Sequence, residues 1–512
     1  MKATIRLLTL LCVMLGAGQV HAQKIRFKIE GQSDTTVNLV RYFGKGLYYA
    51  DTAEIVDGYV EFDGSKNKHG ILALFLPGQK LLEFIHNGEP DVYIESNTVD
   101  LMAYAKVKKS EENKIFIEYA KYISGNRRRL DQLVTERKEL EEESEEYEKI
   151  TDKIDQINKD VIDYQNNIIE NNSEMLVAKL TLMSQDIEVP EPPKDDQGNI
   201  LDSNFRFSYY RSHYWDHIDL SDDRLVRTPI FHGKLEKFMS KQMVFQHWDS
   251  VIYWAYWLCD QLDPSSDMYQ YCVSWITSNY EKSKIMGMDK VFVKMADRYY
   301  CASDGSGRPK AFWMPDNKLV ELCDRTEILT NLVMDAKPPN ILLLDSTNRV
   351  WRDYYSLDCE YTLLYFWDPE CGHCKKITPK LQTLYEKKFA ERGIEIFAVG
   401  KAVGEDFEKW KTFIRKHNLQ FINVAVTDSL YNVAQKDALP LLRYTTVESL
   451  NYQKTFDIYS TPKVIILDKD KKVIGKGLSI SQLEDFLDRK QGQKDAEKLF
   501  PIEEEPVEEQ IH

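Results

Sequence analysis

Two cysteines separated by two residues carry the strongest chemical signal in this 512-residue sequence. The motif Cys371-Gly-His-Cys374 follows the apolar run 361–367 and opens a segment with helical spacing. A thiol at the first turn of a helix lies beside unpaired N–H groups and the positive end of the helix dipole, which both favour its thiolate form. We therefore expect Cys371 to be the attacking nucleophile and Cys374 to be the thiol that resolves the mixed disulfide.

The residues around the two cysteines are expected to tune their redox chemistry, namely Glu370, Gly372 and His373. His373 can favour the thiolate, which makes the disulfide form more oxidising. A zinc site would need a second closely spaced pair of ligands, and the sequence has no other Cys-x-x-Cys. His213 and His217 are four residues apart but lack the glutamate of the zinc-protease motif. We predict neither a metal nor a cofactor.

A second set of residues supports the same chemistry. Thr461 and Pro462 stand directly before the apolar run 463–467, and a proline at the start of an interior strand is unusual unless its peptide bond is cis in a tight turn. The order of a strand, Trp367-x-x-x-Cys-x-x-Cys, a helix and a late Thr-Pro before a strand resembles the thioredoxin fold. The resemblance implies that Pro462 is cis and faces the cysteines, and that Thr461, Pro462 and Trp367 bind substrate.

A predicted β-hairpin over 341–351 and an N-terminal leader resemble the TlpA-like branch of bacterial envelope thiol–disulfide oxidoreductases. The chain is also similar to envelope proteins in which a small β-sandwich and a helical domain precede such a module. The resemblance implies an enzyme that exchanges disulfides with protein dithiol or disulfide substrates and with an unidentified electron donor or acceptor.

The sequence departs from that pattern at two positions. Tyr365 stands where thioredoxin has a buried aspartate, and Ile377 stands where some TlpA-like reductases have a glutamate. Glu370 or water is then expected to accept the proton of Cys374. The Gly-His dipeptide between the cysteines is the pattern of protein disulfide isomerases, so reduction and oxidation or isomerisation both stay open.

The first 22 residues have the composition of a signal peptide. Lys2 and Arg6 precede an apolar run over 7–20, and Val20-His-Ala22 is a small-residue cleavage site. We expect export to the periplasm or cell envelope and no integral membrane segment after cleavage, because no later run is apolar enough to span a bilayer.

The composition indicates an acidic protein of several globular domains. The 67 Lys and Arg against 82 Asp and Glu give a net charge of −15, which makes nucleic acid an unsuitable partner. Hydrophobic periodicity predicts an all-β sandwich of about seven strands, an all-α domain with a long helical hairpin at about 115–186, and an α/β thioredoxin-like domain. The predicted signal peptide covers 1–22, the β-sandwich 23–105, the helical domain 106–335 and the thioredoxin-like domain 336–490. An acidic disordered tail is predicted over 491–512.

An apolar seam runs along the second arm of the predicted hairpin, at positions 147, 150, 154, 157, 161, 164 and 168. It suits either an intramolecular helical hairpin or a coiled coil that makes a dimer. The segment 428–454 is longer than this connection usually needs, and we expect it to line the substrate groove beside Thr461.

The sequence does not determine how the five further cysteines of the mature chain pair. Because their number is odd, at least one of them has no disulfide partner among the others: Cys259, Cys272, Cys301, Cys323 and Cys359.

Two other functions remain as alternatives. The chain could be a non-enzymatic binding or scaffold protein of the envelope, with a regulatory redox site. A thiol peroxidase of the peroxiredoxin type needs Thr or Ser three residues before its reactive cysteine, and Asp368 stands there.

Overall fold

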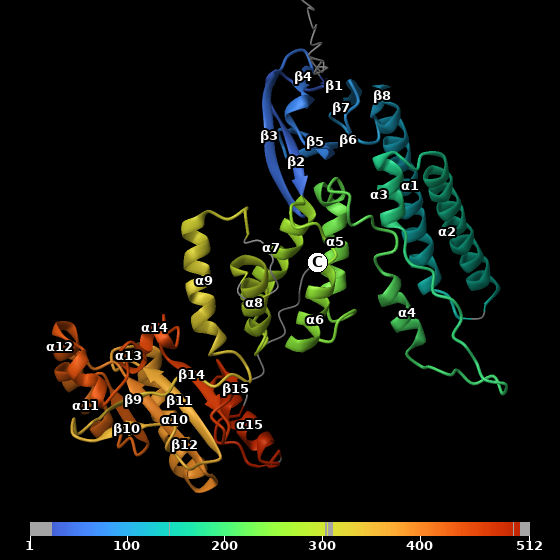
Figure 1. Cartoon of the computed structure of the whole chain (residues 1–512). Helices are drawn as coiled ribbons and strands as arrows, with labels where there is room; N and C mark the ends of the chain where they lie inside the picture. Colours follow the sequence, from blue (N-terminus) through green and yellow to red (C-terminus); the bar gives the residue numbers. More distant parts are fainter. Residues whose placement is uncertain (1–22, 143, 303–304, 306–310, 495, 502–512) are drawn as a thin grey trace, which may run out of the picture. The chain divides into compact units, whose positions relative to one another are not determined.

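The computed structural model describes residues 23–142, 144–302, 305, 311–494 and 496–501. The predicted signal peptide (1–22) and the part of the predicted tail over 502–512 lie outside the described residues. The chain divides into two compact units, one made of Met1–Val244 with Leu258–Cys272 and one made of Phe245–Trp257 with Val273–His512. Figure 1 shows the elements of both units in sequence colours.

The first unit begins with a β-sandwich, as predicted, of two four-stranded sheets. Ile25, Phe27 and Ile29 of its first strand point into the core, so the period-two pattern places alternate residues between the sheets. The strand orders are β4-β1-β7-β8 and β3-β2-β5-β6. The strands are β1 (Lys24–Glu30), β2 (Thr35–Phe43), β3 (Gly46–Ile55), β4 (Tyr59–Asp63), β5 (Gly70–Leu76), β6 (Lys80–His86), β7 (Asp91–Asn97) and β8 (Lys106–Lys109).

The described sandwich has eight strands where about seven were predicted, and β3 and β8 have the weakest strand pattern in the sequence. Each lies at the edge of its sheet, and each buries few side chains, so its hydrophobic alternation is weak. Tyr48 and Tyr49 on β3 are exposed.

The predicted helical hairpin follows the sandwich. Its arms are α1 (Glu111–Lys138) and α2 (Glu145–Asn171), and the Ser144 side chain caps α2 by accepting a hydrogen bond from Tyr147 N. Leu133 of α1 and Ile154 and Ile157 of α2 form a buried cluster. The apolar seam thus packs against the other arm of the same chain, and a dimer stays a prediction.

Further helices follow the hairpin along the chain and are drawn in green to yellow in Figure 1. They are α3 (Leu176–Ser184), α4 (Phe205–His213), η2 (Leu225–Arg227), α5 (Pro229–Met239), α6 (Trp248–Cys259), α7 (Asp267–Glu281), α8 (Asp289–Ala296), η3 (Asp297–Cys301) and α9 (Asp316–Thr330). A short helix, η1 (Gly64–Lys66), lies within the sandwich.

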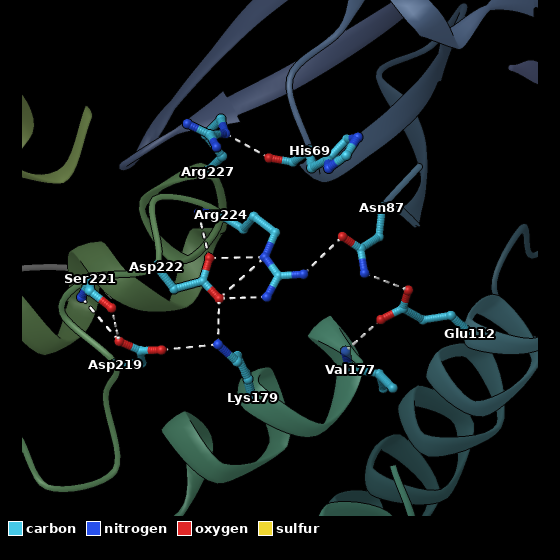
Figure 2. A network of polar contacts seen from close by, with 10 residues as sticks. All are labelled: His69, Asn87, Glu112, Val177, Lys179, Asp219, Ser221, Asp222, Arg224 and Arg227. Carbon is cyan, nitrogen blue, oxygen red and sulfur yellow. Dashed lines mark hydrogen bonds and ion pairs between the residues drawn. The ribbon is translucent and has the colours of Figure 1, made fainter. Parts of the chain in front are cut away.

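A network of polar contacts joins the sandwich to the helices of the first unit (Figure 2). Asp222 accepts hydrogen bonds from Lys179 Nζ at 2.7 Å and from Arg224 Nη2 at 2.6 Å. Arg224 also donates to Asn87 Oδ1 at 2.9 Å, and Asn87 donates to Glu112 Oε2 at 3.0 Å. Burial raises the pKa of Asp222, but Arg224 and Lys179 lower it by more, so the carboxylate stays charged. The network therefore fixes the sandwich against the helices that follow it.

The second unit contains a seven-stranded sheet in the order β10-β9-β13-β12-β11-β14-β15. The central strand β11 pairs in parallel with β12 and antiparallel with β14. The strands are β9 (Leu342–Asp345), β10 (Trp351–Asp353), β11 (Tyr361–Trp367), β12 (Ile394–Gly400), β13 (Ile422–Ala425), β14 (Lys463–Leu467) and β15 (Val473–Lys476). This is the predicted α/β thioredoxin-like domain.

Helices cover both faces of that sheet. Leu363 and Tyr365 of β11 pack in one core with α10, α11 and α15, whereas Leu364 and Phe366 pack in a second core with residues of α8 and α9. A strand buried on both faces explains why 361–367 reads as a continuous apolar run. The helices of the domain are α10 (Gly372–Leu384), η4 (Tyr385–Phe389), η5 (Ala390–Arg392), α11 (Asp406–Lys416) and α15 (Ile480–Lys490).

The segment after β13 is helical rather than a long irregular connection. It forms α12 (Asp428–Lys436), η6 (Leu439–Arg443), α13 (Val447–Leu450) and α14 (Tyr452–Thr455). Ser449 is buried and its hydroxyl accepts a hydrogen bond from Leu342 N at 2.9 Å. This tertiary anchor, which local spacing does not reveal, holds the segment against β9.

A disulfide joins Cys301 and Cys323, which are 22 residues apart, in the second unit. Closing a loop of this length removes entropy from the unfolded chain, so the bond contributes about 3 kcal/mol. We expect the double variant Cys301→Ala/Cys323→Ala to lose that free energy of unfolding in denaturant titration. Cys272→Ala, which alters a buried free thiol, is the control for losing a cysteine as such. Equal stability of the double variant and the parent would contradict the prediction.

Candidate active site

The two cysteines of the motif lie where the central strand passes into its helix. β11 ends at Trp367, and Cys371 N donates a hydrogen bond to Asp368 O at 3.1 Å, which closes a tight turn. Cys371 is the N-cap of α10, and its carbonyl oxygen accepts the first helical hydrogen bond from Lys375 N at 3.0 Å. The Cys371 side chain therefore stands beside the free N–H groups of the first helical turn.

Cys371 and Cys374 differ in exposure as their predicted roles require. Cys371 is half-buried and Cys374 is fully buried one turn along the helix. Cys371 Sγ donates to the carbonyl oxygen of Thr461 at 3.2 Å. The peptide bond between Thr461 and Pro462 is cis, as predicted from the position of the proline. The strand end, the helix and the loop before β14 thus meet at one accessible sulfur.

The surroundings of the two thiols give them different pKa values. Partial burial raises the pKa of Cys371, but several hydrogen bonds, of which that from the Cys374 backbone N–H is the largest, together lower it by more, so it lies below that of an ordinary thiol. Burial raises the pKa of Cys374 to about 11. At neutral pH the exposed sulfur is the better nucleophile and the buried one stays protonated.

This asymmetry predicts the pH dependence of alkylation. In a Cys374→Ser variant the backbone N–H donors remain, so we expect Cys371 to react with iodoacetamide with an inflection below the pKa of about 8.5 of a free cysteine. The rate rises as pH increases through the lowered pKa, because only the thiolate reacts. Peptide mass mapping at a series of pH values measures the rate at Cys371. An inflection at or above the free-cysteine value would refute the lowered pKa.

The buried position beneath the cysteines is occupied by a phenol. Tyr365 is fully buried, and its hydroxyl shares a hydrogen bond of 2.7 Å with Thr378 Oγ1. Burial raises the pKa of Tyr365, so this group does not accept a proton from Cys374.

Charged side chains surround the rim of the site. Glu370 is exposed and lies 3.4 Å from Lys375 Nζ and 3.7 Å from Lys409 Nζ. Asp368 lies 3.5 Å from Lys401 Nζ. Lys401 and Lys409 were not predicted from the sequence. They follow β12 in the chain, and they reach the rim of the site only because β12 pairs with β11 in the sheet.

The flanking residues of the motif, Gly372 and His373, are both exposed at the start of α10. They lie at the surface that a partner of Cys371 would meet.

A cavity of about 230 Å³ lies next to the cysteines within the second unit. The cis-proline loop and the segment after β13 both contribute to it. Trp367 is buried along its wall, and Tyr459 on the loop is 84% exposed. Its lining consists of Phe366, Trp367, Asp368, Lys401, Tyr452, Gln453, Ile458, Tyr459, Ser460 and Thr461. Among its lining residues, Thr461 connects the cavity to the motif, because its carbonyl oxygen contacts Cys371 Sγ.

Comparison with protein families gives three matches along the chain. A family described as thioredoxin-like matches residues 358–473, which span β11, the cysteines and the cis-proline. Two domains of unknown function, DUF4369 and DUF5106, match residues 24–116 and 136–322. No curated protein matches the sequence.

Several solved bacterial structures are similar to part of the chain. A domain of a possible thiol-disulfide isomerase from Cytophaga hutchinsonii is 32% identical, with 32% of this chain and 97% of that chain covered and a TM-score of 0.25. The thioredoxin domain of a thiol-disulfide oxidoreductase from Bacteroides vulgatus is 20% identical, with 31% and 96% covered and a TM-score of 0.25. A thioredoxin-like protein from Bacteroides caccae is 14% identical, with 59% and 98% covered and a TM-score of 0.39. With its Cys-x-x-Cys after β11 and its cis-proline before β14, the segment 358–473 is a thioredoxin-like domain.

Proposed function

We propose that this protein is an exported thiol–disulfide oxidoreductase that exchanges disulfides with protein substrates through Cys371 and Cys374. One observation carries the proposal. The sulfur of Cys371 is partly exposed, has a lowered pKa and lies 3.2 Å from the carbonyl oxygen of Thr461, which precedes the cis-proline. The second thiol, that of Cys374, is buried in the core. This arrangement suits a substrate cysteine that approaches along the loop.

In the reducing direction, the Cys371 thiolate attacks one sulfur of a substrate disulfide. The substrate S–S bond breaks, its second sulfur leaves as a thiolate that takes up a proton, and a mixed disulfide joins Cys371 to the substrate. Cys374 then loses its proton and attacks Cys371 Sγ, which releases the substrate dithiol and leaves the Cys371–Cys374 disulfide. Oxidation of a substrate is the same sequence in reverse.

The proton of Cys374 has to leave a buried site. Tyr365 keeps its own proton, and Ile377 offers no acceptor. Glu370 is held at the rim by two lysines, so we assign the acceptor role to water or to the departing substrate thiolate.

Substrate binding is assigned to Thr461 and Pro462 with the adjoining cavity. Trp367, which was predicted to bind substrate, is 1% exposed and packs on Phe413, so it supports the cavity wall from within the core. The backbone of Thr461 borders both the sulfur and the cavity, so an extended polypeptide can lie along it with its cysteine at Cys371. Tyr459 offers an exposed ring beside this path.

Export follows from the predicted signal peptide. The disulfide between Cys301 and Cys323 suits an oxidising compartment such as the periplasm. Among the described residues, no helix has the length and apolar character needed to cross a membrane.

Trapping the mixed disulfide tests the proposal. The Cys374→Ala variant cannot release its substrate, so we expect envelope proteins to accumulate on Cys371 as reducible adducts visible by mass spectrometry. The matched control is Cys371→Ala/Cys374→Ala, which should capture none. Absence of adducts from the single variant would refute the proposal.

The reduction potential of the Cys371/Cys374 couple decides the direction of electron flow. A value of about −270 mV, that of thioredoxin, would indicate a reductase, whereas about −180 to −120 mV would indicate an oxidase or isomerase.

A further inference from the structure

Lys471, at the turn between β14 and β15, has a backbone conformation and a degree of burial that are both unusual for lysine. Lys471 has a φ of +65°, in the left-handed region that favours glycine or asparagine. Its side chain is nevertheless directed inward, and the residue is only 4% exposed. Lysine is almost never buried unless it is paired, and backbone strain of this kind is characteristic of functional positions. The fold therefore holds this amino group in a defined place at some cost.

The contacts of the amino group are with neutral oxygens and one sulfur. Lys471 Nζ donates to Thr362 Oγ1 at 2.8 Å and to Leu357 O at 2.9 Å, and it lies 3.6 Å from Cys359 Sγ. Within the described parts of the chain, no carboxylate forms an ion pair with it. Cys359 is the member of this contact set that can carry a negative charge and can be oxidised.

The thiol is held in place and remains accessible. Cys359 Sγ lies 3.3 Å from Thr362 Oγ1 and 3.8 Å from Leu357 O, so it shares both of the oxygens that hold the lysine. Cys359 is a free cysteine and only half-buried, so a small oxidant can reach it. The amino group of Lys471 and an oxidisable sulfur thus lie 3.6 Å apart.

We propose that Cys359 and Lys471 are a modification site at which hydrogen peroxide forms a covalent sulfur–nitrogen bond. This site is separate from Cys371 and Cys374, and the inference does not depend on their function. The class of co-reactant is a small peroxide.

The reaction has two steps. The Cys359 thiolate attacks one oxygen of hydrogen peroxide, the O–O bond breaks, and a sulfenic acid and hydroxide form. The hydroxide takes a proton from the Lys471 ammonium, which gives water and a neutral amine. The amine then attacks the sulfur, the S–O bond breaks, and the departing hydroxide takes the remaining surplus proton from nitrogen. In sum, one thiol, one amine and one peroxide give the S–N link and two waters, with the sulfur oxidised by two electrons.

The cross-link would join two parts of the domain that are far apart in sequence. Cys359 precedes β11, the strand that leads to the redox cysteines, and Lys471 lies between β14 and β15. The bond would close the chain between these positions and restrict the unfolded state. A thiol reductant attacks the sulfur and releases the amine, so the modification is reversible.

Peptide mass spectrometry of the full chain tests the proposal. To remove competing thiol exchange, the parent for this experiment carries Cys371→Ser and Cys374→Ser. After treatment with hydrogen peroxide, blocking of free thiols and proteolysis, we expect a peptide pair joined through Cys359 and Lys471 that lacks two hydrogens relative to the separate peptides. Dithiothreitol should separate the pair.

Two lysine variants make the assignment specific. Lys471→Arg keeps the positive charge but removes the primary amine, and should abolish the joined pair. Lys472→Arg alters the exposed neighbouring lysine and should leave the yield unchanged. Recovery of Cys359 as sulfinic or sulfonic acid with Lys471 free in the parent protein would overturn the proposal, whether or not the variants fold. So would an equal yield of the pair in Lys472→Arg and Lys471→Arg.

Discussion

The Cys371→Ser variant should reduce a protein disulfide at least about 1000-fold more slowly than the parent, because it lacks the sulfur that forms the mixed disulfide. A serine hydroxyl is not ionised at neutral pH and cannot form an S–S bond. The fold should persist, since Cys371 is half-buried and its backbone contacts do not involve the side chain. Turnover of an insulin-type disulfide substrate with excess dithiol measures the loss.

The control is Cys359→Ser, which removes the other half-exposed free thiol of the domain. It should retain turnover within about twofold, because Cys359 lies before β11 and the reaction occurs after it. Equal activity of Cys371→Ser and the parent would mean that exchange takes place at another thiol. Equal loss in both variants would mean that the assay reports general thiol content or stability.

Local patterns were sufficient to predict the elements that carry the candidate site. Three features can be recognised within about ten residues of sequence each: a strand buried on both faces, a Cys-x-x-Cys after it, and a proline before a later strand. The structure places β11 at the predicted Tyr361–Trp367, starts α10 within the motif, and has the Thr461–Pro462 bond in the cis form.

Features that depend on contacts between distant residues could not be predicted in this way. Lys401 lies near Asp368 only because β12 pairs with β11, and neither residue has a distinctive local pattern. The pairing of Cys301 with Cys323 was one of several possibilities among five cysteines. In the sequence, Lys471 looks like an ordinary charged residue of an exposed turn. Its burial follows from the contacts of its side chain with Leu357 and Thr362, which are distant in the sequence.

Asp488→Ala should destabilise the thioredoxin-like domain by about 3 kcal/mol, since it breaks a buried charge cluster. Asp488 on α15 has no exposed side-chain area and lies 2.7 Å from Arg392, 2.7 Å from Lys498 and 3.2 Å from Lys388. Its removal leaves these cations, which are themselves mostly buried, without one of their carboxylates. Hydrogen exchange of the β11 and β12 amides measures the opening free energy of this domain within the full chain.

The matched control for Asp488 is a carboxylate at the surface of the same domain. Glu408 of α11 pairs with Lys411 at 2.6 Å, and the Glu408 side chain is 69% exposed, so Glu408→Ala should cost about 1 kcal/mol or less. Similar losses in the two variants would show that net charge, and not burial, determines the effect.

The pH dependence separates the charge of Asp488 from its volume. Burial raises the pKa of Asp488, but Lys498, Arg392 and Lys388 lower it by more, so the folded-state pKa lies below the unfolded value. A carboxylate of this kind stabilises the fold fully above its unfolded pKa, and the contribution is lost as pH falls through the folded pKa. The nearly isosteric Asp488→Asn variant removes the charge and little volume. Its deficit relative to the parent should therefore be largest near neutral pH and shrink on acidification, whereas a deficit independent of pH would identify packing as the cause.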